Sequence, residues 1–304
     1  MSTARGWVQG YNAQAIVNPR QIVLACEVSQ DANDTQLYQP MADMLERTLT
    51  AAGITAAIDL VLADAGYWSE NNATSPGPDR LIATMKDHKQ RRAARELGQT
   101  TGPPPPNATP AEEMEHLLRT PQGAAAYAQR SGLIEPIFGD HKHNRGIRSF
   151  RRRGLSAVRS EWAFIHLAGN MLKLHQQFSL ITMIPLAATV ILGSFAGGKA
   201  TSSTDRVVHA SLGGVTVVLY GTTAYYALFA PKVSDAPTRG NIRLHKALAW
   251  VHGAGMILTP ILGEMAYQQK SQGEKVHGIA SAHGVVGITT LIAYGAAILT
   301  ETLK

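Results

Sequence analysis

The sequence predicts an α/β domain followed by an all-α domain of four transmembrane helices. The first observation is charge: residues 1–177 contain 19 Lys and Arg and 17 Asp and Glu, whereas residues 178–304 contain only 9 and 5. The second is that the later half has four stretches without any of these residues. The third is that the earlier half alternates short apolar runs with segments of helical spacing. We therefore expect one domain at 1–177 and a second at 178–304.

The composition of the 304-residue chain excludes two broad classes of protein. Charged residues make up 16% of the chain and hydrophobic residues 45%. A typical soluble protein has about 25% charged residues, so the chain is not a charge-rich disordered protein. Cys26 is the only cysteine, which excludes a scaffold of intrachain disulfides.

The earlier half begins with a predicted hairpin and a helix. Two strands are expected at Trp7–Val17 and Gln21–Val28, joined by a turn at Asn18-Pro19-Arg20. A helix over 34–52 follows, because apolar residues recur there at helical spacing as far as Gly53.

Two further strands and two helices follow along the chain. Ile58–Ala63 is an apolar run typical of a buried strand, and Leu81–Met85 predicts a second short strand. Residues 97–110 include four consecutive prolines and predict a loop. Thr109 is placed to cap a helix with an acidic first turn, and 124–141 predicts another helix.

The later half contains four apolar stretches that we interpret as membrane helices. They are Phe178–Gly198, Val207–Pro231, Ala247–Gly263 and Val276–Thr300. A helix needs about 20 mostly apolar residues to cross the hydrocarbon core. The third stretch reaches that length when Leu244 and His245, which precede Lys246, are included. The long side chain of Lys246 can extend to the membrane interface. Buried helices of a large soluble protein are the alternative, but this half has too few charges to cover a soluble surface.

Basic loop residues give an orientation. Four basic residues follow the second stretch, on the same side as the basic segment that precedes the first: Lys232, Arg239, Arg243 and Lys246. The positive-inside rule then favours a multi-pass protein of a prokaryotic inner membrane with both termini cytoplasmic.

Histidines are the functional candidates of the membrane half, since ionisable groups at such depth are costly. A b-type haem takes two axial imidazoles from separate helices. His252 and His283 lie deepest in the predicted helices and are favoured as haem ligands or as a proton relay. An interfacial position is an equal alternative for the others, which are His209, His245 and His277. The segments Leu244-His-Lys-Ala-Leu-Ala-Trp and Ser281-Ala-His-Gly-Val-Val-Gly resemble helices of transmembrane b-type cytochromes, which implies haem b and a redox partner that the sequence does not identify.

Several motifs of the earlier half share a second resemblance. They are Gly10-Tyr-Asn-Ala-Gln-Ala, Leu62-Ala-Asp-Ala-Gly-Tyr-Trp-Ser-Glu, Leu81-Ile-Ala-Thr, Glu135-Pro-Ile-Phe-Gly, Asn144-Arg-Gly and Phe150-Arg-Arg-Arg-Gly-Leu. From about residue 6 to residue 175 the chain resembles insertion-sequence transposases with a DDE catalytic core. The resemblance implies a ribonuclease H-like fold, with Asp64 as the second catalytic Asp and Glu135 as the catalytic Glu.

The resemblance also implies a cofactor and DNA contacts. Asp64 and Glu135 would hold Mg²⁺ ions, because two-metal phosphoryl transfer needs clustered carboxylates. Tyr127, Arg130 and Lys142 would contact DNA around the active site. A basic cluster would contact phosphates, or would form a solvated basic face; it consists of Lys142, Arg145, Arg148, Arg151, Arg152, Arg153 and Arg159.

One element of the catalytic core is missing from the pattern. The family's first catalytic Asp lies on an opening strand ahead of the segment that starts at Gly10, and none of the nine residues before Gly10 is acidic. Asp31 and Asp34 fall after the second predicted strand and do not replace it. The earlier half is therefore interpreted as an incomplete, catalytically inactive ribonuclease H-like domain.

Three functions remain open. The favoured one is a fusion, near residues 176–178, of a truncated transposase with a four-helix membrane module that binds haem. The second is an active DDE transposase that receives its first Asp in trans. The third is a membrane electron carrier with a passive soluble half. Expected partners are DNA, bound without sequence specificity, the lipid membrane, and a second copy of the chain.

Overall fold

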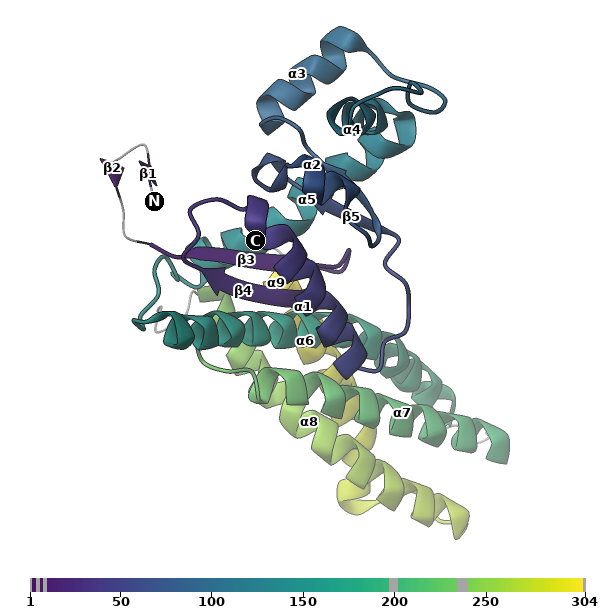
Figure 1. The fold of residues 1–304 in the computed structure, drawn as a ribbon. Helices are drawn as coiled ribbons and strands as arrows, with labels where there is room; N and C mark the ends of the chain where they lie inside the picture. The colour runs from purple at the N-terminus through teal and green to yellow at the C-terminus, as the bar shows by residue number, and fades with distance from the viewer. Residues whose placement is uncertain (1, 4–5, 8–9, 197–201, 234–239, 303–304) are drawn as a thin grey trace. The chain divides into compact units, whose positions relative to one another are not determined.

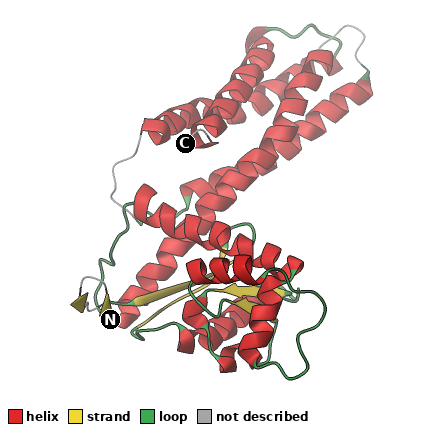
Figure 2. Cartoon of the chain, turned by 90° about the horizontal axis from the view of Figure 1, so that it is seen from above, coloured by secondary structure: helices red, strands yellow, loops and turns green. Residues whose placement is uncertain are grey.

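A computed structural model describes residues 2–3, 6–7, 10–196, 202–233 and 240–302 (Figure 1). The chain divides into two compact units, Met1–Gly169 and Asn170–Lys304. Strands occur in the N-terminal unit, and the described part of the C-terminal unit is built from helices and loops (Figure 2). The predicted stretches Trp7–Val17 and Phe178–Gly198 include residues 8–9 and 197–198, which lie outside the described residues.

The predicted hairpin is confirmed. After the short pair β1 (Ser2–Thr3) and β2 (Gly6–Trp7), β3 (Asn12–Val17) pairs antiparallel with β4 (Val23–Ser29). The Asn18 side chain holds the turn, because its Oδ1 accepts hydrogen bonds from the backbone N–H groups of Arg20 and Ile22, both at 3.0 Å.

The predicted helix after the hairpin is also present. A 3-10 turn, η1 (Thr35–Leu37), leads into α1 (Tyr38–Ala51), and Gly53 follows with a φ of 68°. Met41 and Leu45 are buried against Ala25 of β4, so α1 packs along the hairpin (Figure 1).

The second pair of strands is parallel. β5 (Leu60–Ala63) pairs with β6 (Asp79–Ile82), and η2 (Ala65–Tyr67) and α2 (Glu70–Thr74) lie between them in the chain. The strand predicted at Leu81–Met85 is therefore shifted toward the N-terminus. The strands of the described residues form three separate two-stranded sheets.

Helices complete the N-terminal unit. α3 (Asp87–Leu97) precedes the predicted proline-rich loop, and α4 (Pro110–Arg119) begins with a capping box between Thr109 and Glu112. α5 (Pro121–Gly139) continues into a π-helical turn, η3 (Asp140–Asn144). The start of α6 (Leu155–Ala196) also belongs to this unit, and α6 continues into the C-terminal unit.

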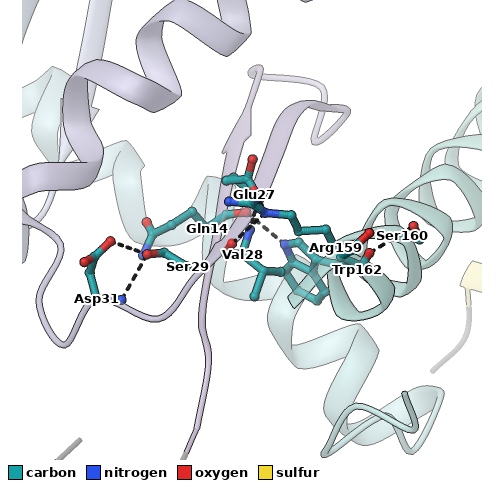
Figure 3. A network of polar contacts seen from close by, with 9 residues as sticks. Gln14, Glu27, Val28, Ser29, Asp31, Arg159, Ser160 and Trp162 are labelled. Atoms are coloured by element: carbon teal, nitrogen blue, oxygen red, sulfur yellow. Dashed lines mark hydrogen bonds and ion pairs between the residues drawn. The ribbon is translucent and has the colours of Figure 1, made fainter. Parts of the chain in front are cut away.

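The first turns of α6 are fixed to the hairpin by two side chains (Figure 3). Trp162 Nε1 donates to the Gln14 carbonyl at 2.9 Å. Arg159 Nε donates to the Val28 carbonyl at 3.1 Å and lies 2.6 Å from the Glu27 carboxylate. These contacts join residues that are more than 130 positions apart in the chain.

The C-terminal unit contains the rest of α6, then α7 (Ser203–Leu228), α8 (Gly240–Ser271), the 3-10 turn η4 (Gly278–Ala282) and α9 (His283–Thr302). The expected helix start at Val276 is wrong. Gly278 has a φ of 60°, which interrupts the helix, so regular α-helix begins only at His283.

Three helical segments of the described residues are long and apolar enough to cross a membrane: Leu155–Ala196, Ser203–Leu228 and Gly278–Thr300. The third predicted span, Ala247–Gly263 in α8, is not among these segments, so four membrane helices are not confirmed by the described residues. Large apolar side chains of the three spans point outward; Ile184, Val218 and Val285 are each about 70% exposed. An outward apolar surface is what a lipid environment requires.

The interior of the C-terminal unit combines apolar and polar side chains. Leu186, Met256 and Tyr294 form its buried apolar cluster. Buried threonines lie on all of α6, α7 and α9, namely Thr182, Thr216, Thr223 and Thr290. Each of their hydroxyls donates to a backbone carbonyl four residues earlier, so these polar groups are satisfied inside the bundle.

Candidate functional site

Asp64 lies at the carboxyl end of β5, where the sequence analysis placed it. Its side chain caps η2, because Oδ1 accepts a hydrogen bond from the Gly66 backbone N–H at 2.8 Å. The strand, predicted to be buried, is buried only at Ala63, and it delivers the carboxylate to the edge of the sheet, where sites in α/β folds collect.

A second carboxylate, Asp34, faces the same glycine. A Cβ atom on Gly66 would lie 2.6 Å from Asp34 Oδ2 and 3.0 Å from Asp64 Oδ1. Asp34 Oδ1 accepts hydrogen bonds from Asn12 Nδ2 at 2.6 Å and from Gln14 Nε2 at 2.8 Å. Asp34 is not among the catalytic residues predicted from the sequence. The available signal was the spacing of Asn12 and Gln14, which places two amide donors on one face of a strand.

Tyr67 and Asn72 stabilise the loop around this pair of carboxylates. Asn72 Nδ2 donates to the carbonyls of Thr35 and Tyr67, each at 2.7 Å. Burial raises the pKa of Tyr67, and the negative charges of Asp34 and Asp64 raise it further. The phenol therefore stays neutral beside the two carboxylates.

Glu135 is exposed on α5 and is followed by Pro136 within the helix. Among the residues that the structure describes, no three His, Cys, Asp or Glu side chains are grouped closely enough to hold a metal ion. Asp34 lies near Asp64, but among the described residues no third His, Cys, Asp or Glu side chain joins them to form a metal site. The residues present therefore do not fit a two-metal centre, which needs clustered carboxylates.

The other residues expected around the active site pack on α5 and η3. The Arg130 guanidinium lies 5.7 Å from the centre of the Tyr127 ring, and the Lys142 ammonium lies 6.0 Å from the Phe138 ring. Such cation–π contacts stabilise the local helix surface.

The basic cluster is divided between structural and exposed positions. Arg145 forms an ion pair with Asp140 at 2.7 Å, and Arg159 contacts the hairpin as described above. Arg148, Arg151, Arg152 and Arg153 are exposed on the segment between η3 and α6. Glu161 fixes that segment, because its carboxylate accepts hydrogen bonds from the backbone N–H groups of Arg151 and Arg152 at 2.9 to 3.1 Å.

A buried histidine pair, which the sequence analysis missed, lies beside this segment. His141 Nε2 and His166 Nδ1 are 3.4 Å apart, and both rings contact Trp162. Burial, together with the nearby Arg145 charge, lowers the pKa of His141 to about 4. His141 is therefore neutral at pH 7.

The histidines of the C-terminal unit are arranged differently from the expectation. The His283 ring contacts His209, with ring centres 5.9 Å apart, and does not meet His252 in a ring contact. His252 Nδ1 lies 3.0 Å from the Tyr220 hydroxyl, and its ring also contacts Tyr294. His277 lies between α8 and α9, where its exposed side chain is 3.4 Å from Glu274.

His245 has a partner that the sequence analysis did not name. The rings of His175 on α6 and His245 on α8 have centres 6.0 Å apart. His175 lies three residues before the charge-free stretch that begins at Phe178 and therefore outside the predicted membrane helices.

Comparison with known proteins identifies the N-terminal unit. No curated protein and no solved structure matches the chain. The family model described as "Transposase DDE domain" matches residues 1–171, which is more than half of the chain and ends close to the boundary between the two units. The matched residues contain the Asn12–Gln14–Asp34 contacts, Asp64 and the exposed arginines, and the chain therefore belongs to the transposase DDE domain family.

Proposed function

We propose that the N-terminal unit is a ribonuclease H-like transposase domain that binds DNA without cleaving it, joined by gene fusion to an integral membrane module. The observation that carries the loss of catalysis is the carboxylate arrangement. Asp34 and Asp64 face one glycine, and the described residues place no third ligand beside them. Transposases with a DDE core typically use Mg²⁺, and activating a water and a leaving group on two such ions requires the full carboxylate set.

DNA binding does not depend on that arrangement. The exposed arginines of residues 148–153 can neutralise phosphates without an intact catalytic centre, because phosphate contacts are electrostatic and independent of sequence. Glu161 accepts hydrogen bonds from the backbone of this segment, and the side chains of Arg148, Arg151, Arg152 and Arg153 are exposed.

We expect no Mg²⁺-dependent strand cleavage by the chain alone. The test incubates the detergent-purified chain with supercoiled donor DNA that carries candidate terminal repeats, and measures nicking. Cleavage that disappears in an Asp64→Ala variant would contradict the proposal. The alternative function, an active transposase that receives the first Asp in trans, requires cleavage to appear only when a second polypeptide with that Asp is added.

We expect DNA binding that weakens steeply with salt. Affinity for a random duplex should fall roughly tenfold or more between low and moderate salt if several phosphates are contacted. Replacing Arg151, Arg152 and Arg153 together by Ala should remove most of this salt dependence. A control variant removes the same charge from α3, where Lys89, Arg92 and Arg95 are exposed. Equal loss in the two variants would show that net charge, and not the 148–153 segment, determines binding.

A second candidate function belongs to the C-terminal unit, which we propose is a multi-pass module of a prokaryotic inner membrane with both termini cytoplasmic. The paired histidine rings would hold haem b, which when bound would supply one-electron transfer between a redox donor and an acceptor. Visible absorbance of the purified chain before and after dithionite reduction tests whether haem is bound. Resistance of the chain to alkaline extraction from membranes tests the membrane assignment separately.

A further inference from the structure

Two histidine pairs in the C-terminal unit have the same geometry. His175 of α6 and His245 of α8 have ring centres 6.0 Å apart with ring planes at 87°. His209 of α7 and His283 of α9 have ring centres 5.9 Å apart with ring planes at 90°. Each pair therefore joins two helices that are not consecutive in the chain.

All four rings use the same nitrogen for a structural hydrogen bond. Nδ1 of each ring lies 2.9 to 3.1 Å from a backbone carbonyl of a neighbouring helix; the carbonyls belong to Thr223, Ala297, Thr189 and Thr259. A carbonyl oxygen only accepts, so Nδ1 carries the proton and Nε2 carries the lone pair. A backbone carbonyl that fixes the tautomer in this way is the usual support of a metal-ligating histidine.

The distances within each pair suit one metal ion held by both rings. An imidazole nitrogen lies about 2 Å from a bound metal ion and about 1 Å from the centre of its own ring. Two rings on opposite sides of one ion therefore have centres about 6 Å apart. Both measured separations agree with this value.

The supporting contacts repeat between the two halves of the unit. Thr189 follows His175 by fourteen residues, and Thr259 follows His245 by fourteen. In each half the histidine at the start of the next helix donates to that threonine carbonyl.

Glycines extend the repeat. Gly193 and Gly263 each lie four residues after the threonine. A Cβ atom on Gly193 would be 3.0 Å from the His209 ring, and one on Gly263 would be 2.8 Å from the His283 ring. The glycines thus give both rings the space to lie against the neighbouring helix, so the unit presents one ligand arrangement twice.

The repeat places the two pairs at different levels of the bundle. Fourteen residues of α-helix rise about 21 Å. Thr189, whose carbonyl accepts the hydrogen bond from His209, therefore lies about 21 Å along α6 from His175. The hydrocarbon core of a membrane is about 30 Å thick. One pair would therefore lie toward each face of the membrane.

We propose that the C-terminal unit binds two b-type haems, one between His175 and His245 and the other between His209 and His283. The proposal rests on the haem-binding function proposed above and specifies its ligands and its stoichiometry. An iron porphyrin is favoured over a bare metal ion because each site offers two imidazoles and the described residues provide no group of three His, Cys, Asp or Glu ligands. The four nitrogens of a porphyrin supply the remaining coordination.

His252 is not a ligand in this arrangement. It is buried on α8, and its partners are Tyr220 and Tyr294. His252 lies seven residues after His245 on α8. The equivalent position on α6, seven residues after His175, is Thr182. His252 therefore provides a matched control: a buried histidine of the same bundle outside both pairs.

The test measures haem per chain and the visible spectrum of the full-length protein, purified in detergent from haem-replete cells. We expect two low-spin haems per chain. Replacing any one of the four histidines by Ala should leave one low-spin haem. The double variant His209→Ala/His283→Ala should also retain one, because both changes affect the same site. The double variant His209→Ala/His245→Ala should retain none.

His252→Gln and His277→Ala should retain both haems. Where an alanine variant does not fold, the methionine variant of the same residue is used, since Met can ligate haem iron and raises its reduction potential; the potential of one haem should then rise while the other is unchanged. A single haem per chain, or loss of a haem in His252→Gln, overturns the ligand assignment and leaves the haem-binding function standing. A colourless preparation overturns both.

Discussion

Replacing Trp162 by Ala should destabilise the N-terminal unit by about 3–5 kcal/mol, the usual cost of removing a large buried aromatic side chain. Trp162 is 5% exposed, and its indole donates to the Gln14 carbonyl. Its ring stacks on Phe138 with centres 5.9 Å apart and contacts Phe150 edge-on at 5.8 Å. The substitution would therefore remove packing between α5, α6 and the hairpin at one point.

Hydrogen exchange of the β3 and β4 amides in the full chain, measured by mass spectrometry, reports the local free energy of opening. A loss of 3 kcal/mol corresponds to exchange that is faster by about two orders of magnitude. Trp162→Phe keeps most of the packing and loses the indole donor, so its cost should be nearer 1–2 kcal/mol. Phe164→Ala is the control, because Phe164 lies on the same helix and is 53% exposed. Equal exchange in Trp162→Ala and Phe164→Ala would contradict this account.

Elements with local signals were predictable from the sequence. The β3–β4 hairpin and α1 were confirmed because turn residues and apolar spacing act within about 20 residues. The start of α4 followed from Thr109 as the cap and from the acidic first turn, and the structure adds reciprocal hydrogen bonds between Thr109 and Glu112 that form a capping box. In the last helix, the local signal was the glycine at position 278, which was not interpreted as a helix break. Gly278 has a positive φ, so α9 starts at His283 and not at Val276.

The candidate sites were less predictable, because they depend on contacts between distant residues. Asp34 receives hydrogen bonds from Asn12 and Gln14, which lie 22 and 20 positions earlier. Its proximity to Asp64 depends on how η1 and η2 pack together. Sequence position alone gives neither distance, so Asp34 was not assigned, whereas Asp64 was assigned from a motif that resembles those of DDE transposases.

Histidine pairing shows the same difficulty in the C-terminal unit. Depth within a predicted span favoured His252, yet its burial is explained by Tyr220 and Tyr294. Which rings meet depends on the rotation of each helix in the bundle. The repeated spacing of fourteen residues between histidine and carbonyl was present in the sequence, but it has meaning only once the helices are known to be neighbours.

Gly255→Ala should destabilise the C-terminal unit by about 1–3 kcal/mol, the usual cost of overpacking. A Cβ atom on Gly255 would lie 1.9 Å from Thr290 Oγ1 and 3.0 Å from Thr290 Cβ. Thr290 is fully enclosed, and its hydroxyl donates to the Val286 carbonyl at 2.7 Å. The hydroxyl cannot turn away without losing that bond, and the short distance to Cβ means that α8 and α9 must also separate. Thermal unfolding of the detergent-purified chain, followed by far-UV circular dichroism, measures the effect.

Gly214→Ala is the matched control, because Gly214 lies inside α7 and a Cβ there would meet nothing within 4 Å. Alanine is a better helix former than glycine by roughly 0.5–1 kcal/mol, so this control should raise stability while Gly255→Ala lowers it. The double variant Gly255→Ala/Thr290→Ala should lose less than the sum of the two single changes, since it removes the clashing hydroxyl, with a coupling energy of about 0.5–3 kcal/mol. If Gly255→Ala were as stable as Gly214→Ala, close packing of α8 on α9 at this glycine would be wrong.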